Sequence, residues 1–411
     1  MHSSPGVSST RSRDEAVALD EQDALAPFHE RFVVAPDGLV YLDGNSLGRL
    51  PKETPERLKQ VIEQQWGERL IRAWSEGWMQ LPRTIGDQLG SELLGAAAGQ
   101  TALADSTTVC FYKLASAALD ARPDRTEIIT DRDNFPTDRY VLEGLADQRG
   151  LTIRWIEADP HSGPTPDDVE PLISERTALV TFSQVSYRSA FILDTKRITE
   201  IAHADGALAL WDLCHSAGAI PVTLDDDGVD LAVGCTYKYL NAGPGAPAFL
   251  YVATEHQDQL RQPIWGWLGR TDPFEMAQGY IPAQGISKML SGTPPVLALT
   301  AAACGIEISI EAGIDAIRTK SIAITEYAIA LIDELLTQKG CSVGSPRDPS
   351  RRGSHVALVH PEARTLSKQL IDAGVVVDFR TPDVIRLGLS PLTTKFTDVY
   401  DGLQRVGELL S

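Results

Sequence analysis

The feature that most constrains the fold is an alternation of short apolar, β-rich runs with helical stretches between about residues 100 and 300. The runs are apolar at nearly every position, as expected for strands buried on both faces of a parallel sheet that helices cover. The runs lie at 126–130, 152–156, 178–182, 206–211 and 248–252, and helices are predicted at 137–149, 166–174, 194–205 and 297–311. The pattern predicts an α/β fold with a large, doubly wound, mostly parallel sheet.

The segments on either side of this sheet region predict further structural units. The first thirty residues are rich in Ser, Asp and Glu, which is typical of a mobile arm. From about 51 to 79 apolar residues recur at helical spacing. After residue 300 the chain is helical to Lys339 and then mixes short strands with helices. We expect a mobile N-terminal arm at 1–30 and an N-terminal segment at 31–75 that packs with the small domain. We expect a large cofactor-binding domain at 76–300 and a small C-terminal α+β domain at 301–411.

Charge and cysteine content narrow the classes of function. Asp and Glu number 56 against 37 Lys and Arg, a net charge of −19. Such a chain repels phosphate backbones and anionic lipid, so we expect neither nucleic-acid nor membrane partners. No stretch reaches about 18 apolar residues, and no apolar secretion segment precedes a cleavage site. The five cysteines form no C-x-x-C pair, which favours a reducing, cytoplasmic location.

Two charged residues each follow a buried run. Asp212 ends the run 206–211, and Lys238 comes just after another apolar run. Ligands of open α/β sheets bind at the carboxyl ends of the strands, so both side chains can face one site. A Lys that forms a Schiff base and an Asp that pairs with a pyridinium nitrogen suit pyridoxal phosphate. Taken singly, Asp212 could instead cap a helix and Lys238 could be a solvated turn residue.

Several longer segments decide between these interpretations. They are Leu42-Asp-Gly-Asn-Ser-Leu-Gly48, Asn134-Phe-Pro-Thr-Asp138, Asp212-Leu-Cys-His-Ser-Ala-Gly218, Gly234-Cys-Thr-Tyr-Lys-Tyr-Leu-Asn-Ala-Gly-Pro-Gly245 and Ile385-Arg-Leu-Gly388. Together they resemble the kynureninase family, and they occur in family order from about residue 20 to the C-terminus. The resemblance implies a fold-type-I, aminotransferase-like enzyme that uses pyridoxal 5'-phosphate and works as a homodimer with shared active sites.

The resemblance also implies roles at the cofactor ring. Lys238 would hold the cofactor covalently and then move protons, and Asp212 would pair with the pyridine nitrogen. His215 would lie beside Asp212, Phe135 would stack on the ring, and Asp138 would line the pocket nearby. Because Asp212 and His215 have no third ligand close by in the sequence, we expect no metal.

Further roles concern the phosphate. Ser106 and Thr107 precede a helical run and would offer hydroxyl and backbone N–H groups at a helix N-terminus. Tyr237 would add its phenol, and in the family Trp267 and Thr293 reach the phosphate from the neighbouring subunit. Ser106 and Thr107 could also serve only as a helix cap.

For the substrate, Arg386 would clamp the α-carboxylate with its guanidinium fork, and Asn45 would assist it. Trp74, with Gly292 and Thr293, would border the aryl ring. Alternatively, Trp74 could be a core aromatic, Asn45 a turn residue and Arg386 a member of a structural ion pair.

The implied reaction is the hydrolysis of L-kynurenine to anthranilate and L-alanine in tryptophan catabolism, with Tyr237 protonating the Cβ carbon. Trp74 and Thr293 resemble members that prefer the unhydroxylated substrate. The alternatives are a hydrolase of 3-hydroxykynurenine or another substituted kynurenine in secondary metabolism, a cysteine-desulfurase-like lyase using Cys341, and a pyridoxal-dependent sensor domain. Four departures from the family pattern leave substrate preference open: Arg270, Gln184, Ala190 and Cys214.

Overall fold

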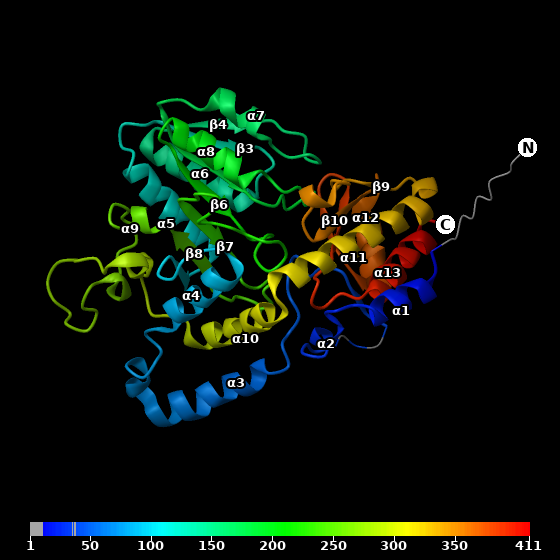
Figure 1. Ribbon diagram of the computed structural model, residues 1–411, viewed down its shortest axis with the longest axis horizontal. Coiled ribbons are helices and arrows are strands. Elements are labelled where there is room, and N and C mark those ends of the chain that lie inside the picture. Colours follow the sequence, from blue (N-terminus) through cyan, green and yellow to red (C-terminus); the bar gives the residue numbers. More distant parts are fainter. Residues whose placement is uncertain (1–10, 35, 37) are drawn as a thin grey trace, which may run out of the picture.

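The computed structural model describes residues 11–411 except 35 and 37. Its large lobe is built on one seven-stranded sheet in the order β2-β8-β7-β6-β5-β3-β4 (Figure 1). Every pairing is parallel except those of β8 with β2 and β7, which confirms the predicted mostly parallel sheet. The strands are β2 Thr101–Ala104, β3 Glu127–Asp131, β4 Thr152–Ile156, β5 Thr177–Ser183, β6 Leu208–Asp212, β7 Leu231–Gly234 and β8 Ala248–Val252.

Helices cover both faces of this sheet, because its central strands are apolar on both sides. All residues of β5 and β6 are buried. One core lies beneath α5 (Thr107–Asp120) and α6 (Pro136–Arg149). The other lies beneath α4 (Leu81–Leu93), α8 (Thr195–Ala204) and α10 (Val296–Ala312), with the short α7 (Pro166–Val169) at its margin. The short α9 (Thr254–Gln257) follows β8.

The smaller lobe contains a four-stranded antiparallel sheet in the order β12-β13-β10-β9. A two-stranded parallel sheet joins β1 to β11, although about 335 residues separate these strands in the sequence. The elements are β1 Val40–Tyr41, β9 Ser342–Val343, β10 His355–Val359, β11 Val375–Val376, β12 Asp378–Arg380, β13 Val384–Gly388, α11 Ile314–Leu335, α12 Ala363–Asp372 and α13 Phe396–Leu409. The early chain therefore completes the small α+β domain.

The N-terminal region differs from the expected mobile arm of residues 1–30. Residues 13–29 form α1 (Arg13–Glu21) and α2 (Ala26–His29), while 1–10 lie outside the described residues. The Asp20 carboxylate accepts hydrogen bonds from the backbone N–H groups of Phe396 (2.6 Å) and Thr397 (3.2 Å), which caps α13. Asp23 pairs with the buried Lys320. These polar contacts, which composition does not show, anchor the segment to the small lobe.

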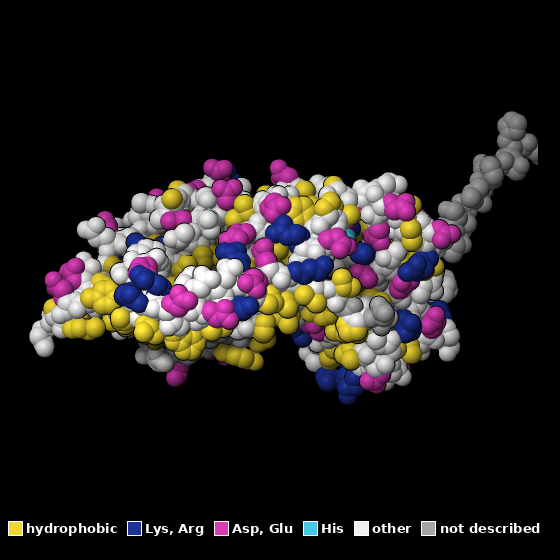
Figure 2. Space-filling model, turned by 90° about the horizontal axis from the view of Figure 1, so that it is seen from below, with side chains coloured by type: hydrophobic (Ala, Val, Ile, Leu, Met, Phe, Trp, Pro, Cys, Tyr) yellow, Lys and Arg dark blue, Asp and Glu magenta, His cyan; other side chains and the backbone are white. Residues whose placement is uncertain are grey.

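The helical segment after residue 51 is not one regular helix. It consists of α3 (Thr54–Gln60), a π-helical stretch (Val61–Arg69) and a 3-10 turn (Leu70–Trp74). Val61 is buried, but Trp66 is 57% and Ile71 76% exposed. The segment lies at the edge of the large lobe in Figure 1, and Figure 2, viewed from that side, shows hydrophobic side chains gathered along this face. The apolar stripe therefore faces outward.

Helices α10 and α11 form the most apolar long stretch. Among the described residues no single helix is long and apolar enough to span a membrane. These two pass that test only together, across a bend of 84°, and each buries many residues within the protein.

Candidate active site

A cavity of about 700 Å³ lies at the carboxyl ends of the parallel strands. Loops after β2, β3, β6 and β7 bring side chains distant in sequence into its walls. Nine of the thirteen site residues predicted from the sequence line it: Ser106, Thr107, Phe135, Asp138, Asp212, His215, Tyr237, Lys238 and Thr293. The expectation that Asp212 and Lys238 face one site therefore agrees with the geometry.

The Lys238 amine lies in the centre of this group. Its Nζ is 3.4 Å from the Nε2 atom of His215, 5.7 Å from the ring centroid of Phe135 and 5.9 Å from that of Tyr237. Burial and the positive charge of Lys238 hold the pKa of His215 well below its usual value. His215 is therefore a neutral imidazole that can accept a hydrogen bond from Lys238.

Two carboxyl groups share the floor of the cavity. Asp212 ends β6, and its Oδ1 accepts a hydrogen bond of 2.7 Å from the backbone N–H of Cys214. Burial and the neighbouring charge of Asp212 hold the pKa of Asp138 well above its usual value. Asp138 therefore favours its protonated form, in which it can donate a hydrogen bond to Asp212. A cationic ring N–H would suit Asp212.

The wall of the cavity that the start of α5 forms suits an anion. The N-terminus of α5 faces the cavity, and Ser106 caps it by accepting a hydrogen bond from the N–H of Val109 (3.5 Å). Thr107 and Thr108 line the same wall. The first turn of a helix presents N–H groups and a partial positive charge, which favour a phosphate.

Arg386, Asn45, Trp74 and Trp267 do not line this cavity. Arg386 is buried on β13 and donates hydrogen bonds to Asp378 and Ser46. Asn45 is fully buried nearby, and its side-chain amide has no partner among the residues that the structure describes. Burial and the charge of Arg386 lower the pKa of His355, on the adjacent strand, to about 3. Sequence reasoning missed Asp378, Ser46 and His355, although Ser46 lies in the quoted segment 42–48.

Trp74 and Arg270 line a separate hollow of about 540 Å³. The Trp74 and Trp267 rings meet edge to face at 6.4 Å. The Arg270 Nη1 donates to the carbonyl of Asp272 at 3.0 Å. Thr293 lines the cavity within this single chain, and its expected action from a neighbouring subunit stays a prediction.

The other departures from the family pattern have local structural roles. Gln184 is buried, and its Nε2 donates to the Thr195 hydroxyl at 2.9 Å. Ala190 has a left-handed backbone, with φ of 65°. Cys214 lines the cavity, and its Sγ accepts from the N–H of Cys235 at 3.2 Å.

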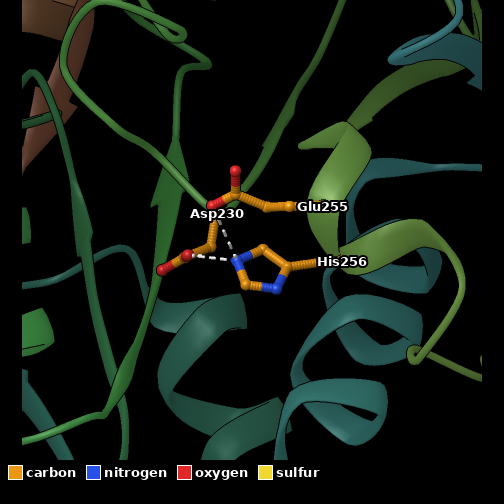
Figure 3. A group of neighbouring side chains, drawn as sticks. All are labelled: Asp230, Glu255 and His256. Carbon is orange, nitrogen blue, oxygen red and sulfur yellow. Dashed lines mark hydrogen bonds and ion pairs between the residues drawn. The ribbon is translucent and has the colours of Figure 1, made fainter.

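A second ionisable cluster lies at the opposite end of β7 from Lys238 (Figure 3). Asp230, Glu255 and His256 place potential metal ligands within 4.8 Å of one another. The buried Asp230 carboxylate accepts hydrogen bonds from the Nε2 atoms of His256 (2.5 Å) and His203 (2.8 Å), and from the backbone N–H of Ala209 (2.7 Å). These contacts already satisfy Asp230, so the cluster is an ion-pair network that ties α8 and α9 to the sheet.

Comparison with solved structures finds other proteins with this fold. A cysteine desulfurase from Thermococcus onnurineus NA1 has a TM-score of 0.78 and 18% identity, covering 90% of this chain and 94% of its own. A mutant of C-DES, solved with glycine covalently linked to its PLP cofactor, has a TM-score of 0.79 and 16% identity, covering 97% and 100%. At these identities the likeness establishes the fold alone.

Sequence comparison identifies the family. The family model of the kynureninase C-terminal domain matches residues 317–406. A kynureninase of Pseudomonas fluorescens is 41% identical over 406 residues, covering 97% of this chain and 95% of its own. A kynureninase of Burkholderia pseudomallei (strain 1106a) is 40% identical over 407 residues, covering 97% and 96%. This similarity extends over the cavity and the small lobe alike, and the chain belongs to the kynureninase family.

Proposed function

We propose that this protein hydrolyses the Cβ–Cγ bond of L-kynurenine to give anthranilate and L-alanine, as a step of tryptophan catabolism, with pyridoxal 5'-phosphate as cofactor. The observation that carries the proposal is the placement of Lys238 and Asp212 in one cavity, at the ends of neighbouring strands. The 41% identity to a kynureninase supports the same reaction.

The residues present fit this cofactor. Lys238 would hold it covalently, Asp212 would pair with the pyridine nitrogen, and Phe135 would stack on the ring. Ser106 and Thr107 at the start of α5 would bind the phosphate. When bound, the cofactor supplies an electron sink for bonds at the substrate's α-carbon. The amine of Lys238, the carboxyl group of Asp212 and the N–H groups at the start of α5 match the aldehyde, the pyridine nitrogen and the phosphate of this cofactor.

The chain's own groups then move protons. Neutral His215 can accept a hydrogen bond from Lys238 and so orient its amine, which would remove the proton at the substrate's α-carbon. Burial raises the pKa of Tyr237, so its phenol remains protonated and can donate to Cβ after the bond has broken. Arg386 would hold the α-carboxylate and Asn45 would assist it, so that the scissile bond is oriented for cleavage.

We propose a cytoplasmic homodimer with shared active sites. The exposed apolar residues Trp66, Ile71, Phe274 and Met276 support an interface with a second copy, since monomers rarely expose large contiguous apolar patches. A second subunit at this face would cover the hollow of Trp74, which we propose borders the substrate's aryl ring, and would bring Trp267 toward the partner's phosphate site. We also propose domain boundaries at 30, 75 and 300, with helices α1 and α2 lying within the first 30 residues.

Cysteine-desulfurase-like chemistry is not favoured. Cys341 is buried in the core of the small lobe, and burial raises the pKa of its thiol to about 11. A persulfide-forming cysteine must be an accessible thiolate.

The proposal is tested by mixing the cofactor-loaded protein with L-kynurenine and following anthranilate fluorescence together with alanine release. Equal, rising amounts of both products are expected, and Lys238→Ala should abolish them. Higher kcat/KM for L-kynurenine than for 3-hydroxykynurenine is expected from Trp74 and Thr293. A large preference for the hydroxylated or another substituted kynurenine would instead point to a biosynthetic role, and no turnover of any of them would refute the proposal.

A further inference from the structure

The guanidinium of Arg386 is already held on several sides by the protein. Its Nε donates to Asp378 Oδ1 at 2.7 Å, and its Nη2 donates to Asp378 Oδ2. Nη2 also donates to the Ser46 hydroxyl at 3.0 Å, and Nη1 donates to the carbonyl of Tyr187 at 2.7 Å. A guanidinium has five N–H groups, so four are accounted for and one, on Nη1, remains.

The position of Asp378 follows from strand register. Asp378 on β12 is the direct antiparallel partner of Arg386 on β13, so both side chains lie on the same face of the sheet. Their contact is bidentate, and the Ser46 hydroxyl braces it by donating to Asp378 Oδ2 at 3.0 Å. Arg380 also contacts Asp378 Oδ2, at 2.7 Å. The carboxylate is therefore fixed from several directions.

We propose that Asp378 is a positioning residue that fixes the Nε–Nη2 edge of Arg386, so that a substrate carboxylate can bind only through the Nη1–Nη2 edge. This inference rests on the proposed role of Arg386. The incoming carboxylate takes the remaining N–H of Nη1 and replaces the Ser46 hydroxyl on Nη2, while Ser46 keeps its bond to Asp378.

Losing the Asp378 charge has a specific consequence. Asp43 is the nearest other carboxylate of the turn that carries Ser46, and its charge interacts with that of Arg386. Without Asp378, the buried guanidinium would turn toward Asp43 and away from the substrate. The expected defect is therefore in binding of the α-carboxylate, not in the proton transfers at Lys238.

The test compares Asp378→Asn with Asp333→Asn. Asp333 makes a similar bidentate pair with Arg347 (2.7 and 2.8 Å) on the surface of the same lobe. We expect Asp378→Asn to raise KM for L-kynurenine at least tenfold while kcat changes less than threefold, and Asp333→Asn to change neither. The inhibition constant of kynuramine, which lacks the carboxylate, should stay constant in both variants. General damage to the site would instead weaken the binding of kynuramine and of L-kynurenine alike.

Asp378→Glu, which keeps the charge but displaces the carboxylate, should raise KM several-fold and gives a second test if Asp378→Asn does not fold. An unchanged or lower KM in these variants would overturn the inference. Asp378 would then have no effect on substrate binding, or would compete with the substrate for Arg386. If the wild-type protein does not hydrolyse L-kynurenine, the proposed function fails separately. Calorimetric titration with L-alanine then decides the inference, since Asp378→Asn should bind it at least tenfold more weakly than Asp333→Asn.

Discussion

Replacing Asp43 by Asn is expected to stabilise the protein in a pH-dependent manner. Asp43 is half-buried beside the ionised Asp378, and its Oδ1 has no hydrogen-bond partner. Burial, together with the charge of Asp378, raises the pKa of Asp43 from 3.8 to about 6. The folded protein therefore holds an ionised carboxylate at neutral pH in a place that favours the neutral form.

The magnitude follows from linkage. One pKa unit is worth about 1.4 kcal/mol, so the rise corresponds to at most about 3 kcal/mol, and solvent screening of a half-buried group reduces this to about 1–2 kcal/mol. Because the folded-state pKa is raised, the cost is absent below about pH 4, where Asp43 is protonated in both states. It grows between pH 4 and 6 and is complete above pH 6. The Asn variant, always neutral, avoids it.

Urea unfolding followed by tryptophan fluorescence at pH 4 and pH 8, at one fixed protein concentration, measures the effect. Asp43→Asn should gain about 1–2 kcal/mol over wild type at pH 8 and nothing at pH 4. The exposed Asp258→Asn variant serves as the control and should match wild type at both values. An equal gain at both pH values, or a loss at pH 8, would refute the reasoning.

Three further outcomes are expected. Asp230→Asn should lose about 3 kcal/mol of unfolding free energy near pH 6. The hydrogen bond that His203 donates to Asp230 raises the pKa of His203. The difference from wild type should therefore shrink as pH rises through that raised pKa, measured by urea unfolding from pH 5 to 9. Ala190→Gly should leave unfolding free energy within about 0.5 kcal/mol of wild type, because relief of left-handed strain (about 1 kcal/mol) offsets the lost methyl (about 0.8 kcal/mol). Cys341→Ser should retain kynurenine turnover. Its thermal midpoint should fall, because the substitution buries a hydroxyl group. Lost turnover in a folded variant would instead support the lyase alternative.

The grouping of the candidate site residues in one cavity could be predicted because the main ones carry local signals. Asp212 and Lys238 each follow a run of buried apolar residues, and the ends of such strands meet at one edge of a parallel sheet. Asp378 could not be found in this way, because its importance depends on lying opposite Arg386 across two strands. Register of this kind is set by the turn and the packing of the whole sheet, not by the residues around Asp378.

Two other expectations failed for a related reason. Helical periodicity showed that the segment containing Trp66 has an apolar face, but it could not show that the rest of this chain leaves that face uncovered. Composition suggested an arm before residue 30, yet Asp20 and Asp23 form specific contacts with residues more than 290 positions away. Long-range polar contacts leave no trace in local composition.

The pairing of β1 with β11 has a consequence for the timing of biosynthesis. At about 5–20 residues per second, the ribosome adds the 334 residues from Tyr41 to Val375 in roughly 20–70 s. During this interval the large sheet can form, but the first strand waits without its partner. The turn carrying Asn45 and Ser46 directly follows that strand, so the half of the site that we propose binds the substrate carboxylate is assembled only when the last tenth of the chain has emerged. A nascent chain could thus bind its cofactor well before it can hold a substrate.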